Sequence, residues 1–368
     1  MDHPTNGRRE LLARLPKVEL HCHLLGTIRQ PTMAAIAAKN RARTTREAIE
    51  QFYVRGEKPV GVLHIFRELE THILANTEDF YRIAYEYGES IAPHTVRYAE
   101  VFWNPTGTLK QTHLSYPELQ GAILRGFSDA EHDFGVTCRL IPSIDRQASA
   151  SEAVEMVQLV IVNRDANVIG IGMDYNEVDR PPELFTEAYA LAKRHGLKAT
   201  THAGEFGMPW TNVETALTQL RVDRIDHGYT VLDNPELTAR CAELSILFTV
   251  VPSNSYYLRT LTPEQWAIQH PIRHMARAGL QIHPNTDDPA FHLINPTQCW
   301  ERMVTDFGYG LSDLRDFMCN GLSGAWIDEE MRRRWLREWT VEFDDLVAEA
   351  VVGVDRDDGE SNTAEMNM

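Results

Sequence analysis

Two histidines separated by a single cysteine, His21 and His23, stand at the end of an apolar run that begins at Lys17. In an extended strand successive side chains point to opposite faces, so both imidazoles would share one face and Cys22 would point to the other. Two imidazoles on one face can bind a single cation. An isolated His-x-His pair is also compatible with a structural role, so the interpretation depends on the rest of the chain.

Residues of the same chemical kind recur further along the chain. His202 and Glu205 lie three positions apart, His227 follows an aspartate, and Asp287 is adjacent to Asp288. A hydrolytic metal site needs ligands that leave one position open for water, and histidines with one carboxylate suit Zn²⁺. We therefore expect one zinc ion per chain, held by four residues: His21, His23, His202 and Asp287.

The remaining polar residues predict the roles around that metal. Zinc lowers the pKa of a bound water toward about 7, so hydroxide becomes available at neutral pH. Glu205 is the expected general acid and base, His227 is expected to hold and deprotonate the water, and Asp288 is free to bind substrate. A lone buried histidine is more often a core residue, but several histidines with paired carboxylates favour an active site.

These residues need elements that bring them together. Most of the apolar runs are separated by stretches with helical spacing, such as 183–195, so the chain reads as repeated βα units. Eight such units predict an α/β fold, a (β/α)8 TIM barrel whose active site lies at the carboxyl ends of the strands. The expected strands are 18–23, 96–103, 136–144, 168–174, 198–205, 224–228, 247–254 and 280–288.

Two regions depart from a bare barrel. The stretch 28–93 between the first two strands is far longer than one crossover helix and predicts a helical insertion, either a lid or plain core helices. Its apolar positions include Phe66. After the last strand, 311–351 is helical in character. Residues 1–353 should form a single domain, and the acidic segment 354–368 should be a disordered tail.

Composition restricts the partners. The chain has 368 residues, 43% of them hydrophobic, and a formal net charge of -17 that would repel phosphate backbones. A small-molecule substrate is expected, and nucleic acid is not. No apolar stretch reaches the roughly 18 residues of a membrane span, and the first residues have no signal-peptide core, so we expect a cytoplasmic protein without a membrane partner. The five cysteines are scattered, which argues against a disulfide framework.

Four stretches, 17–28, 202–205, 226–229 and 285–289, together resemble the adenosine deaminase family of the amidohydrolase superfamily. The resemblance implies the same four zinc ligands, Glu205 as the proton donor to purine N1, His227 as the water partner, and Asp288 as the acceptor from protonated N7. The implied reaction is hydrolytic deamination at C6 of a 6-aminopurine. A related branch uses two metals bridged by a carboxylated lysine after the fourth strand; no lysine stands there, so one metal is expected.

The substrate is less sharply defined by this resemblance. Adenosine deaminases usually carry an aspartate that contacts the ribose 5′-hydroxyl where this chain has Leu25. The segments 173–177 and 100–105 are closer to the adenine deaminase branch, whereas 227–229 and 253–256 resemble the nucleoside enzymes. We expect adenosine as the main reading, with adenine or a modified purine as the alternative. Leu25, Asn176 and Phe66 are expected to line the substrate site.

Two rival functions use the same residues differently. A metal-dependent hydrolase on this barrel could act on an amide or a lactone, in which case a second metal or ester turnover would be found. A non-catalytic binding module would need no carboxylic acid beside its metal, so the presence of Glu205 argues against it.

Overall fold

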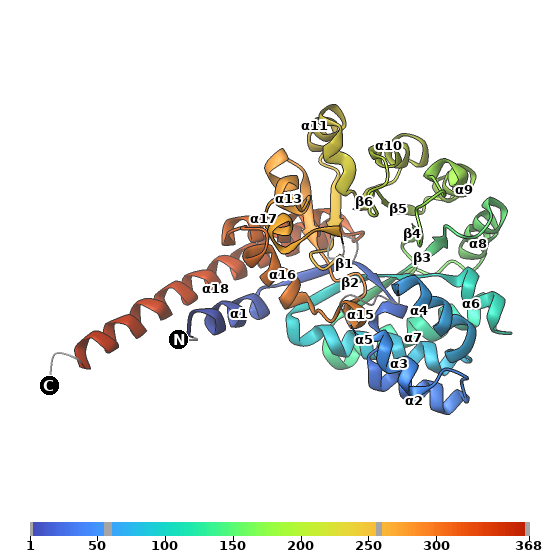
Figure 1. The fold of residues 1–368 in the computed structure, drawn as a ribbon, viewed down its shortest axis with the longest axis horizontal. Helices are drawn as coiled ribbons and strands as arrows, with labels where there is room; N and C mark the ends of the chain where they lie inside the picture. Colours follow the sequence, from blue (N-terminus) through green and yellow to red (C-terminus); the bar gives the residue numbers. More distant parts are fainter. Residues whose placement is uncertain (1–2, 55–60, 255–259, 365–368) are drawn as a thin grey trace.

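The computed structural model describes residues 3–54, 61–254 and 260–364. Eight parallel strands form one sheet in the order of the sequence, from β1 to β8, and helices surround it (Figure 1). The strands are β1 (Lys17–His23), β2 (Val96–Trp103), β3 (Thr137–Asp145), β4 (Gly170–Asp174), β5 (Lys198–Ala203), β6 (Arg224–His227), β7 (Leu247–Val250) and β8 (Gln281–Pro284).

The first and last strands meet at their carboxyl ends and close the sheet on itself. His23 N donates to Asp287 O at 2.9 Å, and Asp287 N donates to His21 O at 3.0 Å. The side chain of Asn285 adds a bond, because its Oδ1 accepts from Leu20 N at 2.8 Å. The expected TIM-barrel-like fold is therefore confirmed, with the two ends of the strand order joined where His21 and His23 lie.

A helical layer covers the barrel. After β2 come α6 and α7, and the pattern of helix after strand continues around the sheet, as βα repetition requires. The helices are α6 (Pro105–Gln111), α7 (Tyr116–Phe134), α8 (Ala150–Val162), η4 (Pro182–Phe185), α9 (Thr186–Arg194), α10 (Trp210–Thr215), η5 (Ala216–Leu220), η6 (Tyr229–Asp233), α11 (Pro235–Glu243), α13 (Pro263–Gln269), α14 (Ile272–Met275), η7 (Ala276–Ala278), α15 (Pro289–His292), α16 (Pro296–Thr305) and α17 (Leu311–Gly324).

The insertion between β1 and β2 is helical, as the sequence predicts. In Figure 1 its helices gather on one side of the barrel. A five-residue π-helical segment, η2 (Leu69–Ile73), continues directly from α4 (Val62–Glu68). π-helical segments are rare and frequently mark functional positions. The other insertion elements are η1 (Leu25–Thr27), α2 (Gln30–Asn40), α3 (Arg46–Phe52), α5 (Thr77–Ile91) and η3 (Ala92–His94).

The two terminal helices lie side by side at one edge of the barrel. Arg14 of α1 (His3–Arg14) donates to Glu349 of α18 (Glu329–Ala364) at 2.8 Å, and α18 then projects away from the barrel (Figure 1). Since no proline interrupts α18, the helix runs to Ala364, well inside the segment expected to be an irregular tail. Residues 365–368 lie outside the described residues, and the domain boundary at 353 stays a prediction.

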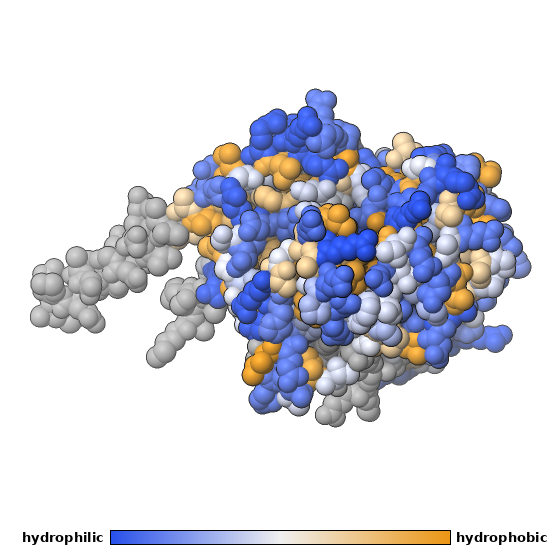
Figure 2. Space-filling view, turned by 90° about the horizontal axis from the view of Figure 1, so that it is seen from above, coloured by the Kyte–Doolittle hydropathy of each residue, from blue (hydrophilic) through white to orange (hydrophobic). Residues whose placement is uncertain are grey.

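The surface agrees with the acidic, charged composition. Figure 2 shows hydrophilic residues over most of one face, with hydrophobic residues scattered among them. None of the described helices is both long and apolar enough to cross a membrane.

Candidate functional site

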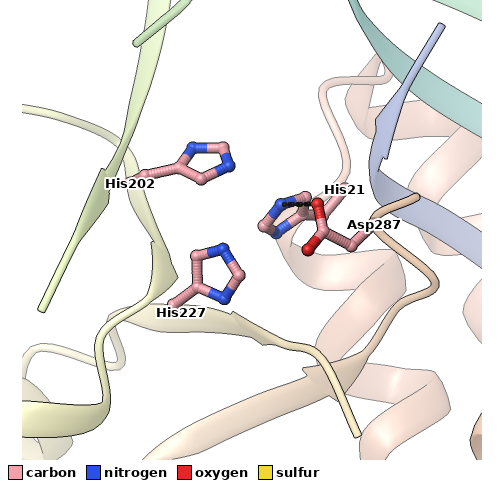
Figure 3. A group of neighbouring side chains, drawn as sticks. All are labelled: His21, His202, His227 and Asp287. Carbon is pink, nitrogen blue, oxygen red and sulfur yellow. Dashed lines mark ion pairs between the residues drawn. The ribbon is translucent and has the colours of Figure 1, made fainter. Parts of the chain in front are cut away.

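Five side chains from three strands and the turn after β8 converge at the carboxyl end of the barrel. His21 Nε2 lies 3.3 Å from Asp287 Oδ1, and His23 Nε2 lies 3.2 Å from the same oxygen and 3.2 Å from His202 Nε2. One ligand atom each of His21, His202, His227 and Asp287 also falls within a 4.8 Å group (Figure 3). All five residues are buried. The cluster contains all four residues predicted as ligands, but the group whose spacing suits one metal ion includes His227 and not His23, so the ligand set stays a prediction.

A hydrogen bond to His21 determines which of its nitrogens faces the cluster. Its Nδ1 lies 3.0 Å from Thr249 Oγ1, and Thr249 donates its only hydroxyl proton to Asp226 Oδ1 at 2.8 Å. His21 must therefore donate from Nδ1, which leaves the lone pair of Nε2 facing the cluster. Within the described residues that buried Nε2 has no hydrogen-bond partner. A buried acceptor left in this way fits a metal ion.

Two further carboxylates lie close to the other histidines. Asp226 Oδ2 lies 3.5 Å from His202 Nδ1, and Asp174 Oδ2 lies 3.3 Å from His23 Nδ1. A carboxylate on one ring nitrogen fixes the tautomer and raises the basicity of the other nitrogen, an arrangement common around metals. The sequence predictions assign no role of their own to Asp174 or Asp226, although the Asp-His pair that ends β6 offers a signal.

The charges in the cluster favour a cation. Although burial would raise the pKa of Asp287, the adjacent imidazoles of His21 and His23 hold that pKa well below its usual range. Burial opposes protonation of His23, but Asp174 and Asp287 raise its pKa well above the ordinary value. The carboxylates therefore stabilise positive charge at this position, whether a proton or a metal ion supplies it.

The backbone at two of these residues adopts the left-handed conformation. His227 and Asp287 both have φ 64°. This conformation costs a non-glycine residue of order 1 kcal/mol and persists where the surroundings over-determine it. Both backbone groups of Asp287 are bound to β1, which supplies that constraint and turns its carboxylate toward the histidines.

Glu205 lies on one side of the cluster, next to His227. Its Oε2 is 3.5 Å from His227 Nε2, and its Oε1 accepts from Asn254 Nδ2 at 3.0 Å. Burial, and then the charges of Asp287 and Glu177, raise the pKa of Glu205 well above its ordinary value. Burial, and then His21 and His202, lower the pKa of His227 well below the usual range. Burial thus favours the neutral form of both side chains.

Asp288 lies beside the turn that carries Leu25. A Cβ atom on Gly26 would sit 2.1 Å from Asp288 Oδ1, so the missing side chain of Gly26 gives that carboxylate its space. Leu25 is buried, at 2% exposure. His292, which the sequence analysis did not single out, approaches Asp288 with Nε2 3.9 Å from Oδ2. The structure thus brings Leu25 and Asp288 to one side of the site.

The insertion supplies an aromatic contact to the cluster. The ring of Phe66 lies 5.9 Å from that of His23 and 6.0 Å from that of Tyr175. The neighbouring Arg67 stacks over Tyr175 at 4.3 Å and pairs with Asp145 at the end of β3. Phe66 therefore lies next to a candidate ligand, as a substrate-lining residue would. Closure of the insertion as a lid stays a prediction.

Asn176 is the predicted site residue that the structure connects least to the cluster. It is half-buried, and its Oδ1 accepts from Val178 N at 3.0 Å within its own loop. Its role in substrate binding stays a prediction. Ser255 and Tyr256, part of the segment that resembles the nucleoside enzymes, lie outside the described residues.

A parallel barrel with a buried histidine and aspartate cluster at its carboxyl end is the architecture of the amidohydrolase superfamily. Residues 16–340 match the family model for adenosine deaminase. The chain belongs to the adenosine deaminase family.

One curated relative and two solved structures show which proteins of this kind the chain resembles. An adenine deaminase of Streptomyces coelicolor is 32% identical over 338 residues, 89% of this chain and 96% of the relative. A crystal structure of an amidohydrolase from Burkholderia ambifaria with bound zinc has a TM-score of 0.93 and 54% identity, covering 95% of this chain and 96% of that one. An adenine deaminase from Arthrobacter aurescens has a TM-score of 0.82 and 26% identity, covering 90% and 99%.

Proposed function

We propose that this protein is a zinc-dependent deaminase of a 6-aminopurine and that its substrate is adenine. The observation that carries deamination is the pair of Glu205 and His227, 3.5 Å apart, in which His227 itself belongs to a group of residues able to hold one metal ion. The relatives named adenine deaminase support the free base. The sequence analysis favoured adenosine, and this preference is the part that the relatives do not support.

The proposed zinc ligands are His21, His23 and His202 through Nε2, with Asp287 through a carboxylate oxygen. Nitrogen and oxygen donors of this kind suit Zn²⁺, and the zinc-bound relative supports that choice. When bound, zinc would act as a Lewis acid that makes water a nucleophile at neutral pH. We keep His227 outside the ligand set because its Nε2 faces Glu205.

The chain's own residues then manage the protons. Glu205, whose burial favours the protonated carboxyl, gives its proton to purine N1 and so makes C6 electrophilic. His227, neutral for the same reason, accepts a hydrogen bond from the attacking water and orients it. Asp288 accepts from N7–H and fixes the ring. Water adds at C6, ammonia leaves, and the product is the 6-oxopurine.

Leu25 supports the free base over the nucleoside. A buried apolar side chain stands where adenosine deaminases carry the acceptor for the ribose 5′-hydroxyl. A buried hydroxyl without a partner costs about 1 to 3 kcal/mol, which disfavours a sugar at this position. Arg67 does not favour a nucleotide either, because Asp145 and Glu70 already pair with its guanidinium.

The rival amide or lactone hydrolase is less well supported. The curated relative and one of the solved structures most similar to this chain are named adenine deaminases, which supports deamination instead. A cytoplasmic location stays a prediction.

A spectrophotometric comparison of four compounds tests the proposal. Adenine, adenosine, 5′-deoxyadenosine and AMP are offered to the zinc-loaded protein, and the loss of 6-aminopurine absorbance is followed. Adenine should give the highest kcat/KM. A higher kcat/KM for adenosine would overturn the choice of substrate, and turnover of an ester or lactone without any purine turnover would overturn deamination.

A further inference from the structure

Glu177, which follows β4, is a buried carboxylate that binds donors from two other parts of the chain. Its Oε1 accepts from Gly204 N at 2.9 Å and from Asn212 Nδ2 at 2.8 Å, and its Oε2 accepts from Glu205 N at 3.2 Å. The residue is 2% exposed. Hydrogen bonds to an ionised acceptor are about twice as strong as neutral ones, so these bonds fix the surrounding backbone firmly.

Two of the donors are consecutive backbone amides, and they belong to the turn that carries the proposed acid. β5 ends at Ala203, and Gly204 then adopts φ +68°. A Cβ atom on Gly204 would lie 2.4 Å from Thr230 Oγ1, so this sharp turn requires glycine. Successive N–H groups in a left-handed turn form a concave anion site, and here the Glu177 carboxylate fills it.

We propose that Glu177 is a positioning residue for Glu205: by binding the amides of Gly204 and Glu205, it sets the direction in which the Glu205 carboxyl leaves the end of β5. This inference rests on the proposed role of Glu205 as proton donor. Asn212 on α10 completes the support, because it ties the same carboxylate to the helix that follows β5. A displacement of a catalytic group by about 1 Å can cost 10²-fold in rate.

The central test is Glu177→Gln, which keeps the size of the side chain but turns an NH₂ group toward backbone N–H donors. We expect kcat on adenine to fall roughly 10- to 100-fold, as for other residues that orient a catalytic group, with little change in KM or zinc content. The matched control is Glu183→Gln, since Glu183 is an exposed glutamate in the same connection. It should leave all three quantities unchanged. Unchanged kcat in Glu177→Gln, or a change confined to KM, would overturn the proposal.

A double-mutant cycle separates positioning from general structural damage. If Glu177 acts through Glu205, then Glu177→Gln should cause almost no further loss of kcat in a Glu205→Gln background. An equal loss in both backgrounds would show that Glu177 acts by another route. If Glu177→Gln does not fold, Asn212→Ala removes one supporting donor and should show the same non-additive pattern with a loss of up to about 10-fold; an additive loss there would count against the proposal.

Hydrogen exchange gives a readout that does not depend on turnover. The amides of Gly204 and Glu205 should exchange faster in zinc-loaded Glu177→Gln than in the unaltered protein, while amides of β2 keep their protection. Unchanged protection at 204 and 205 would overturn the positioning role. If the unaltered protein deaminates no 6-aminopurine but this change in exchange is seen, the proposed function fails and the structural part of the inference stands.

Discussion

At the scale of single residues, the site depends on which nitrogen of each imidazole carries the proton. Thr249 shows how this is controlled. Its hydroxyl proton goes to Asp226, so it can only accept from His21, and His21 presents Nε2 as a lone-pair donor to the cluster. The neutral hydroxyl of Thr249 thus selects one tautomer of His21, although Thr249 is not itself a proposed ligand.

Thr249→Val tests this control. The substitution keeps the shape of the side chain but leaves the Nδ1–H of His21 without an acceptor, and zinc affinity should fall about 10- to 100-fold. Thr249→Ser, which keeps the hydroxyl, is the control and should retain most of the affinity. Chelator competition measures both. Equal affinities for the two variants would show that Thr249 does not set the tautomer.

Glu205 and His202 should separate into an acid and a ligand. Glu205→Gln keeps the metal but has no proton to give, so kcat should fall by about 10²- to 10⁴-fold with zinc content unchanged. His202→Ala should lose both zinc and activity. Metal analysis and steady-state kinetics on the same preparations decide this. Near-normal kcat in zinc-loaded Glu205→Gln would mean that the proton comes from elsewhere.

Leu25→Asp should improve the nucleoside substrate. The new carboxylate would accept from a ribose 5′-hydroxyl, and kcat/KM for adenosine relative to 5′-deoxyadenosine should rise roughly 5- to 150-fold, the value of about 1 to 3 kcal/mol. Adenine should gain nothing. If the native protein already prefers adenosine over 5′-deoxyadenosine by more than about tenfold, and the variant adds nothing, another residue holds that hydroxyl.

At the scale of elements, the insertion is fastened to the barrel by charged groups. Arg67 of α4 pairs with Asp145 at the end of β3 and with Glu70 of η2 at 3.0 Å. The π-helical segment lets Glu70 face the barrel, where it is 2% exposed. Phe66, the residue before Arg67, is held against His23 by this contact. A substitution that removes the ion pair of Arg67 with Asp145 should therefore also alter the contact of Phe66 with His23.

The stability of the folded protein should depend on pH through the protonation of Glu70. Burial, opposed by Arg67, raises the pKa of Glu70 from 4.5 to about 7. Between these values the folded protein keeps a proton that the unfolded chain has released, so stability falls as pH rises through this window and is constant above it. The full effect is at most about 3 kcal/mol. Glu70→Gln should remove this contribution and so make the slope shallower, while buried Glu19, whose pKa burial raises to about 8, keeps its own contribution.

Urea unfolding at several pH values between about 4.5 and 7.5 measures how the free energy of unfolding changes with pH. Exposed Glu78, in the same insertion, supplies the control Glu78→Gln, which should keep the native slope. A Glu70→Gln protein with an unaltered slope would contradict the assignment.

Much of the element order could be predicted from the sequence, because buried parallel strands are apolar runs and the helices between them have helical spacing. The ends of the strands were less predictable. The expected strand 198–205 stops at Ala203, since Gly204 turns the chain, and the expected strand 280–288 stops at Pro284. Such ends depend on contacts with other strands, which no local pattern contains.

The candidate site shows the same division. The types and spacing of His21, His23, His202 and Asp287 sufficed to predict that these side chains converge, which the structure shows. They did not reveal that Glu177 would accept hydrogen bonds from the amides of Gly204 and Glu205. Those two residues lie 27 and 28 positions further along the chain and follow a different strand, so no local pattern connects them with Glu177. Positioning residues are defined by the fold, whereas ligands are defined by their chemistry.

At the scale of the whole molecule, zinc should stabilise the barrel. The proposed ligands come from β1, β5 and the end of β8, so one ion would link distant parts of the sheet. Metal analysis should find about one zinc per chain, and chelation should lower both activity and Tm. A ligand at 1,000 times its Kd adds about 4 kcal/mol of stability. Two equivalents per chain, or full activity after exhaustive chelation, would contradict the single-zinc proposal.

The closure between β1 and β8 has a consequence for how the protein is made. Leu20 is bonded to Asn285 across 265 positions of sequence, and the candidate ligands His21, His23 and Asp287 sit on either side of the same seam. When the first seven strands have left the ribosome, the nascent chain therefore has the histidines of the cluster but still lacks Asp287. Activity begins as a late event in synthesis, and a chain truncated before residue 287 should be inert however well its earlier strands pair.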